Sequence, residues 1–159
     1  LLRYLVATAH HVPVSGITIH SLSSGQLVAE TPIGQVNVSH SRIPGMWAGA
    51  TARAFPIGLD LVDVSAFPVD IDGDAISADT WATLEALAKV TQRGLDWVLS
   101  AACYPVDGLL TAPSGDRYRA AFLPNLPAEI RGVVVVPVEH TCDVKDVDIV
   151  AEIICHFNE

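Results

Sequence analysis

Two carboxylates and a lysine in the middle of the chain, Asp60, Glu85 and Lys89, have the types and spacing of a phosphate-handling site. Asp60 is the lone carboxylate in the apolar stretch 57–62. Trp81, Glu85 and Lys89 recur at four-residue intervals, which places them on one face of a predicted helix. A strand carboxylate that faces a helix carboxylate can hold a hard divalent cation, and a lysine one turn further on can neutralise a phosphate. The pattern predicts metal-assisted binding of a phosphorylated substrate, as in phosphoryl-group transfer.

The elements that must position these residues are a buried strand and a helix. The continuous apolar run over 55–64 predicts a strand that is buried on both faces. The helix is predicted over 80–92, with Ser77 or Asp79 as its N-cap, and the acidic stretch 70–79 before it is interpreted as a loop. Other strands are predicted over 16–21, 26–29, 34–39, 46–53, 117–123, 132–138 and 147–155, and a first helix over 1–11. This order of elements predicts an α+β fold.

The composition limits the classes of protein to which the chain can belong. It has 159 residues, of which 50% are hydrophobic and 17% charged, so one core-forming domain over 1–159 is expected, with a possible boundary between two halves near residue 55. A net charge of -9 argues against nucleic-acid binding, and no apolar run is long enough to span a membrane. Three cysteines without metal-type spacing predict free thiols, as in a cytoplasmic protein.

Three short motifs follow one another along the chain. They are Ser39-His40-Ser41, then Gly58-Leu59-Asp60, then Trp81, Glu85 and Lys89 with Gly94-Leu95 behind them. In this order they resemble the 4′-phosphopantetheinyl transferase superfamily. Its members have a Ser-His-Ser strand end, a Gly-x-Asp strand and a helix with Trp, Glu and Lys at similar spacing. The resemblance covers residues 34–95.

The resemblance implies an activity and a role for each matching residue. Coenzyme A would donate its 4′-phosphopantetheine arm to a serine of an acyl or peptidyl carrier protein. Asp60 and Glu85 would bind Mg²⁺, and Glu85 would also help to deprotonate the carrier serine. Lys89 would bind coenzyme A and stabilise charge on the transferred phosphate. Ser39 and His40 would contact coenzyme A, with His40 at a phosphate.

The resemblance also implies a fold and leaves the assembly open. The expected fold is an antiparallel sheet packed against a long helix, with a pseudo-two-fold repeat in some members. Other members are trimers with sites between subunits, so a homo-oligomer is one expectation.

The chain departs from the superfamily pattern at several positions. Val62 replaces a frequent second acid, Leu84 replaces the lysine before the helix glutamate, and Gln26 replaces a lysine. The segment 64–80 is also short. The alternative function is therefore a non-catalytic binding or scaffold domain of a synthase complex.

Simpler interpretations exist for the same residues. Asp60 could cap a turn at a strand end, and Glu85 and Lys89 could form an exposed salt bridge. Asp63 could replace the missing second acid, although strand alternation directs it away from Asp60. A zinc site could combine Cys142 or Cys155 with some of the scattered histidines, since His140 and Cys142 are close in sequence, but no second ligand pair has structural-zinc spacing; these histidines are His10, His11, His20, His140 and His156.

Overall fold

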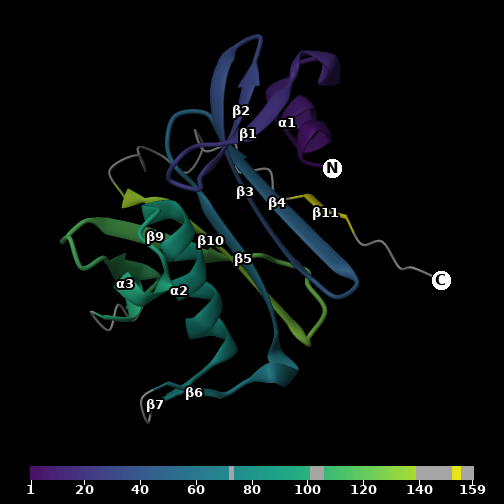
Figure 1. Cartoon of the computed structure of the whole chain (residues 1–159). Helices are drawn as coiled ribbons and strands as arrows, with labels where there is room; N and C mark the ends of the chain where they lie inside the picture. Colours follow the sequence, from purple (N-terminus) through teal and green to yellow (C-terminus); the bar gives the residue numbers. More distant parts are fainter. Residues whose placement is uncertain (72–73, 101–105, 139–151, 155–159) are drawn as a thin grey trace.

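The chain folds as antiparallel β-sheets with packed helices, an α+β arrangement (Figure 1). The computed structural model describes residues 1–71, 74–100, 106–138 and 152–154. The predictions for the three cysteines and for His140 and His156 lie outside these residues, as does most of the predicted strand 147–155. Among the described helices, none is both long and apolar enough to cross a membrane.

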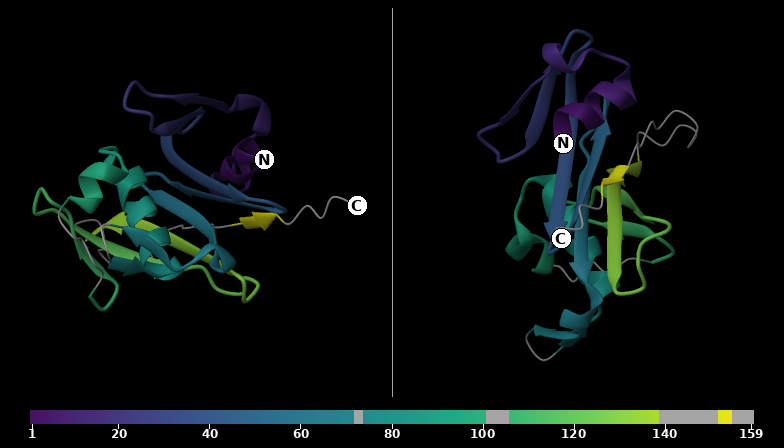
Figure 2. Two further views of the ribbon diagram at one scale, coloured as in Figure 1. Left: turned by 60° about the horizontal axis from the view of Figure 1, so that its bottom comes forward. Right: turned by 90° about the vertical axis from the view of Figure 1, so that its right-hand side faces the viewer.

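The first sheet is built mainly from the N-terminal third of the chain. Its strands are antiparallel and follow the order β1-β2-β3-β4-β11. Their bounds are β1 Thr18–Ser21, β2 Leu27–Thr31, β3 Gly34–Ile43, β4 Met46–Ala52 and β11 Glu152–Ile154. Helix α1 (Leu2–His10) lies against one face of this sheet and buries Leu5 and Val6 there (Figure 2). The predicted first helix and first four strands are thereby confirmed within a few residues.

The second sheet supports the helix that holds Glu85 and Lys89. Its strand order is β5-β10-β9-β8, and all pairings are antiparallel. The bounds are β5 Gly58–Asp63, β8 Leu109–Thr111, β9 Arg117–Phe122 and β10 Ile130–Pro137. Helix α2 (Ala78–Thr91) lies against β5 and β10 (Figure 1), where Leu84, Leu87 and Val90 pack on Val133 and Val135.

The opposite face of the second sheet packs on the first sheet. Alternate residues of β4, including Ala48 and Ala50, share a buried cluster with Leu59 and Leu61 of β5. Alanine side chains let the two sheets approach closely, and β5 is consequently buried on both faces, as predicted. The chain passes from one sheet to the other between Ala52 and Gly58, close to the expected half-boundary at residue 55. The division into domains stays a prediction.

Local signals explain where α2 begins and ends. Its N-cap is Ser77, whose Oγ accepts a hydrogen bond from the backbone N–H of Thr80 at 3.2 Å. Its last residue is Thr91, and the C-cap Gln92 that follows adopts a left-handed conformation with φ of 59°. Gly94, at φ 80°, then begins the short helix α3 (Leu95–Leu99), which the sequence pattern does not predict.

The interpretation of residues 70–79 as a loop is wrong in part. Strands β6 (Val69–Ile71) and β7 (Asp74–Ile76) pair in an antiparallel hairpin. Two three-residue strands are too short to produce a clear periodic pattern. The aspartates spread along this segment also favour its interpretation as a loop.

Candidate functional site

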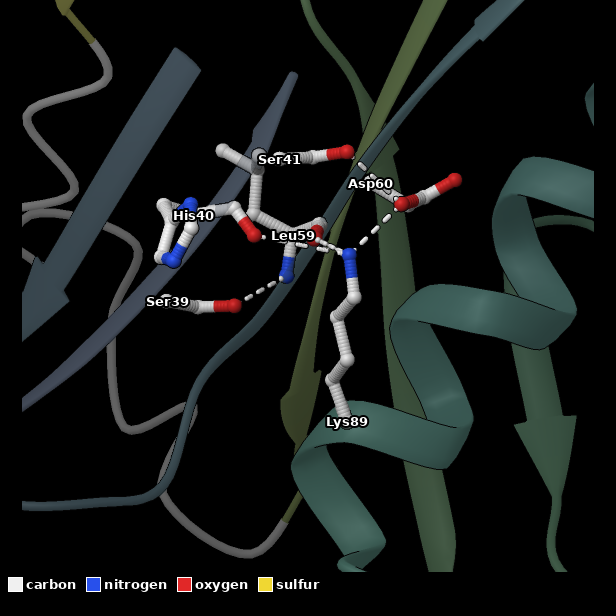
Figure 3. Close-up of polar contacts among 6 residues, drawn as sticks. All are labelled: Ser39, His40, Ser41, Leu59, Asp60 and Lys89. Carbon is white, nitrogen blue, oxygen red and sulfur yellow. Dashed lines mark hydrogen bonds and ion pairs between the residues drawn. The ribbon is translucent and has the colours of Figure 1, made fainter. Parts of the chain in front are cut away.

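Lys89 is the centre of a polar cluster that joins β3, β5 and α2 (Figure 3). Its ammonium nitrogen lies 2.6 Å from Asp60 Oδ1. It also donates to the backbone carbonyl oxygens of Leu59, at 2.9 Å, and of His40, at 3.4 Å. An ammonium group has three hydrogens, and all three have acceptors here. Lys89 thus neutralises Asp60 and ties together two strands that belong to different sheets.

Asp60 is a buried carboxylate with one satisfied and one unsatisfied oxygen. Its exposed fraction is only 2%. Oδ1 accepts hydrogen bonds from Lys89 and from Ser41 Oγ, the latter at 2.9 Å. Oδ2 is also buried, and when Glu85 is ionised it has no hydrogen-bond donor among the described residues. An unpaired buried carboxylate oxygen is energetically costly, so it marks a position where a cation or a proton would be stabilising.

The two serines of the Ser-His-Ser motif join β3 to β5. Ser39 Oγ accepts a hydrogen bond from the backbone N–H of Leu59 at 2.9 Å, and Ser41 donates to Asp60. Side-chain hydroxyls therefore form contacts here between strands of two different sheets. The Ser41 contact is a part of the site that no sequence pattern predicts.

His40 occupies the opposite face of β3, because side chains alternate along a strand. Its ring points away from Lys89 in Figure 3 and stacks on Trp47, with ring centroids 6.4 Å apart. Partial burial lowers the pKa of His40, and the positive charges of Lys89 and Arg42 lower it further. The imidazole is therefore mainly neutral at pH 7. His40 contacts the polar cluster through its backbone carbonyl oxygen, which accepts a hydrogen bond from Lys89.

Glu85 forms the second carboxylate of the cluster. Burial, the hydrogen bond with Asp60 and the negative charge of Asp60 together raise its pKa to about 7, against smaller opposing effects of Lys89 and Trp81. Two neighbouring carboxylates resist simultaneous ionisation, so a protonated Glu85 can donate to Asp60. The ion pair of Lys89 is with Asp60, so the simpler interpretation of Glu85 and Lys89 as an exposed salt bridge is wrong.

Because the pKa of Glu85 is raised, we predict that its contribution to the free energy of unfolding decreases as the pH rises. Between pH 4.5 and 7 the folded state retains a proton that the unfolded state has released, so stability falls as the pH rises. Glu85→Gln cannot ionise and should be more stable than the wild type at pH 8 by about 1 to 3 kcal/mol, but nearly equal to it at pH 4. Urea unfolding with EDTA at both pH values measures this, with the exposed Glu129→Gln as the matched control. Equal stability of Glu85→Gln and wild type at pH 8 would contradict the prediction.

Asp63 has a separate, structural role. Its carboxylate accepts hydrogen bonds from the backbone N–H of Ser65 at 2.8 Å and from the Ser65 hydroxyl at 2.6 Å. These bonds lower the pKa of Asp63. Asp63 is exposed whereas Asp60 is buried, which confirms that strand alternation directs the two acids to different places.

The residues present fit a magnesium ion bound through few protein ligands. Asp60 Oδ2 is a buried oxygen without a partner among the described residues, and Glu85 is the adjacent hard oxygen donor. No cluster of three or more His, Cys, Asp or Glu side chains with metal-binding geometry occurs in the described part of the chain. Mg²⁺ is usually bound by one or two carboxylates together with water and substrate phosphates, so two carboxylates are sufficient.

A cleft of about 410 Å³ adjoins the polar cluster. It lies between the β1–β2 turn, β3 and the C-terminal end of α2. The three residues predicted to bind coenzyme A, Ser39, His40 and Lys89, all line it. Asp60 and Glu85 do not line the cleft, and Lys89 connects the cleft to Asp60.

Three amide side chains form a chain of hydrogen bonds beside this cleft. Gln92 Nε2 donates to Gln26 Oε1, and Gln26 Nε2 donates to Asn37 Oδ1 at 2.7 Å. This links the turn before β2 to the end of α2. In the sequence, Gln26 stands out only as a departure from the superfamily pattern, because a contact over 66 positions leaves no local signal.

Comparison with known proteins adds no further assignment: the chain matches no protein-family model and no curated protein.

Proposed function

We propose that this chain is a 4′-phosphopantetheinyl transferase, which transfers phosphopantetheine from coenzyme A to a serine of an acyl or peptidyl carrier protein with Mg²⁺. One observation carries the proposal: Asp60 Oδ2, which is buried and has no donor among the described residues when Glu85 is ionised, lies beside Glu85 and next to a cleft of ligand size. The three ordered motifs of the sequence support the same activity, as does the α+β fold with antiparallel sheets. The finer superfamily fold is part of this proposal, as is a cytoplasmic location.

In the proposed reaction each side chain has a defined task. Asp60 and Glu85 would hold Mg²⁺, which would reduce the negative charge of the coenzyme A pyrophosphate. Glu85 in its ionised form accepts the proton of the carrier serine hydroxyl. The serine oxygen then forms a bond to phosphorus, and the bond to the adenosine 3′,5′-bisphosphate leaving group breaks. Ser39 and the carbonyl of His40 shape the wall of the cleft beside Lys89.

Calorimetric titration of coenzyme A tests this proposal directly. We expect binding by the wild type only with Mg²⁺, and at least a roughly tenfold loss for Asp60→Asn and for Glu85→Gln, because each change removes a charged ligand. Asp63→Asn is a matched control, since it removes an exposed acid from the same strand. A carrier protein should then gain the mass of phosphopantetheine when it is incubated with the wild type. If the affinity for coenzyme A changes neither on removal of Mg²⁺ nor in Asp60→Asn and Glu85→Gln, the proposed site is refuted.

The second candidate is a non-catalytic domain that keeps this fold for binding. The observation that favours it is the saturation of Lys89, whose three donors all point to acceptors within the protein. A lysine held in this way has no hydrogen left for a phosphate. Magnesium-dependent binding of coenzyme A without any transfer to a carrier protein would favour this candidate.

A further inference from the structure

The rim of the cleft is formed by uncharged amides. Gln26 and Gln92 both line the cleft and are hydrogen-bonded to each other. Each side-chain NH₂ group has two hydrogens, and the contacts with Asn37 and Gln26 use one from each. The rim therefore keeps spare donors, and the Gln26 carbonyl keeps a spare lone pair. Such a rim suits hydroxyl groups, which both donate and accept.

Positive charge is scarce in the same cleft. Among the described residues that line it, Lys89 is the only one with a permanent positive charge, and its three donors are already engaged. His40 is mainly neutral at pH 7, because burial and the neighbouring cations lower its pKa.

The wider electrostatic environment also disfavours an additional phosphate in the cleft. The cleft receives the C-terminal end of α2, including Ala88 and Gln92, where the helix dipole places partial negative charge. The whole chain has a net charge of -9. A terminal phosphate monoester has a charge of about -2 at pH 7, so placing one at this rim would leave it without a free cation among the described residues that line the cleft.

We propose that the cleft prefers a pantetheine nucleotide whose ribose has a free 3′-hydroxyl, of the 3′-dephospho-coenzyme A type, over coenzyme A. The ribose hydroxyls would bind the Gln26–Gln92 rim. This inference rests on the proposed function, because it takes a pantetheine nucleotide as the ligand. It makes Gln26 a residue that determines specificity.

The test compares two ligands and exchanges one rim amide for a cation. Calorimetry with Mg²⁺ should show 3′-dephospho-coenzyme A binding to the wild type more tightly than coenzyme A. Gln26→Lys should shift the ratio of the two affinities about tenfold toward coenzyme A, because an ammonium–phosphate hydrogen bond is charge-assisted. Gln92→Lys provides a second variant in case the first folds poorly. Gln35→Lys, which adds the same charge on β3 outside the cleft, should leave the ratio unchanged.

The possible outcomes separate this inference from the proposed function. If coenzyme A binds the wild type as tightly as its dephospho form or more tightly, the specificity inference is wrong and the proposed function stands. If neither lysine variant shifts the ratio, the amide rim does not select the ligand and the inference is likewise wrong. If neither nucleotide binds at any Mg²⁺ concentration, both the inference and the proposed function fail.

Discussion

Replacing Lys89 by methionine is expected to destabilise the protein by about 2 to 4 kcal/mol at pH 8 in the presence of EDTA. Methionine keeps most of the apolar stem but removes the charge that neutralises Asp60. Asp60 is 2% exposed, and its second oxygen already has no partner within the described residues. The loss should be smaller than for a fully buried pair, because 36% of the Lys89 side chain is exposed. Urea unfolding measures the difference.

Two further variants show whether the effect comes from the buried charge. Asp60→Asn combined with Lys89→Met should recover part of the lost stability, because position 60 then carries no uncompensated charge. Arg131→Met breaks the exposed ion pair with Asp79, at 2.9 Å, and should cost less than about 1 kcal/mol. A loss of similar size for Lys89→Met and Arg131→Met would contradict the assigned role of Lys89.

Magnesium adds an independent measurement on the same variant. If Asp60 and Glu85 bind the ion, Mg²⁺ supplies the positive charge that Lys89→Met lacks. The increase in Tm caused by Mg²⁺ should therefore be larger for Lys89→Met than for the wild type. Addition of Asp60→Asn should abolish this increase, whereas Asp63→Asn should leave it unchanged.

The sequence was sufficient where local patterns determine structure. The cap residue Ser77 and the apolar spacing after it place α2 within two residues of the predicted range. Strand alternation separates the buried Asp60 from the exposed Asp63. The continuous apolar stretch around Asp60 predicts correctly that β5 is buried on both faces. Each of these signals lies within a few residues of the feature that it predicts.

The contacts of the site could not be predicted, because they depend on how the two sheets meet. Ser41 reaches Asp60 only because β3 of the first sheet lies beside β5 of the second. Two of the three acceptors of Lys89 are backbone carbonyl oxygens, and every residue type offers such a group. From the sequence, Lys89 is expected at a substrate phosphate. The structure places its ammonium group on Asp60, and its role toward a ligand stays a prediction.

Gly58→Ala is expected to destabilise the protein by about 3 kcal/mol, since it forces an extra methyl group into a packed core. A Cβ atom at position 58 would overlap the carbonyl oxygen of Ala86 and would lie 2.9 Å from the backbone nitrogen of Val90. Both atoms belong to the backbone of α2, so no side-chain rotation relieves the overlap, and α2 must move away from β5. Thermal and urea unfolding measure the loss.

A glycine without such an overlap provides the comparison. Gly115 has a φ of 90°, and a Cβ atom added there would have no atom within 4 Å. Gly115→Ala therefore tests backbone strain alone and should cost about 1 to 2 kcal/mol. A loss for Gly58→Ala no larger than this would show that α2 adjusts to the methyl group easily.

Gly58→Ala also tests whether the site needs a glycine two positions before Asp60. The atoms that a methyl group at position 58 would strike belong to residues next to Glu85 and Lys89. The close approach of α2 to β5 at Gly58 therefore brings both side chains to Asp60. A displaced helix should weaken the pairing of Lys89 with Asp60 and the hydrogen bond between Glu85 and Asp60. Gly58→Ala should then lose the Mg²⁺-dependent increase in Tm although it retains every proposed ligand, whereas Gly115→Ala should keep that increase.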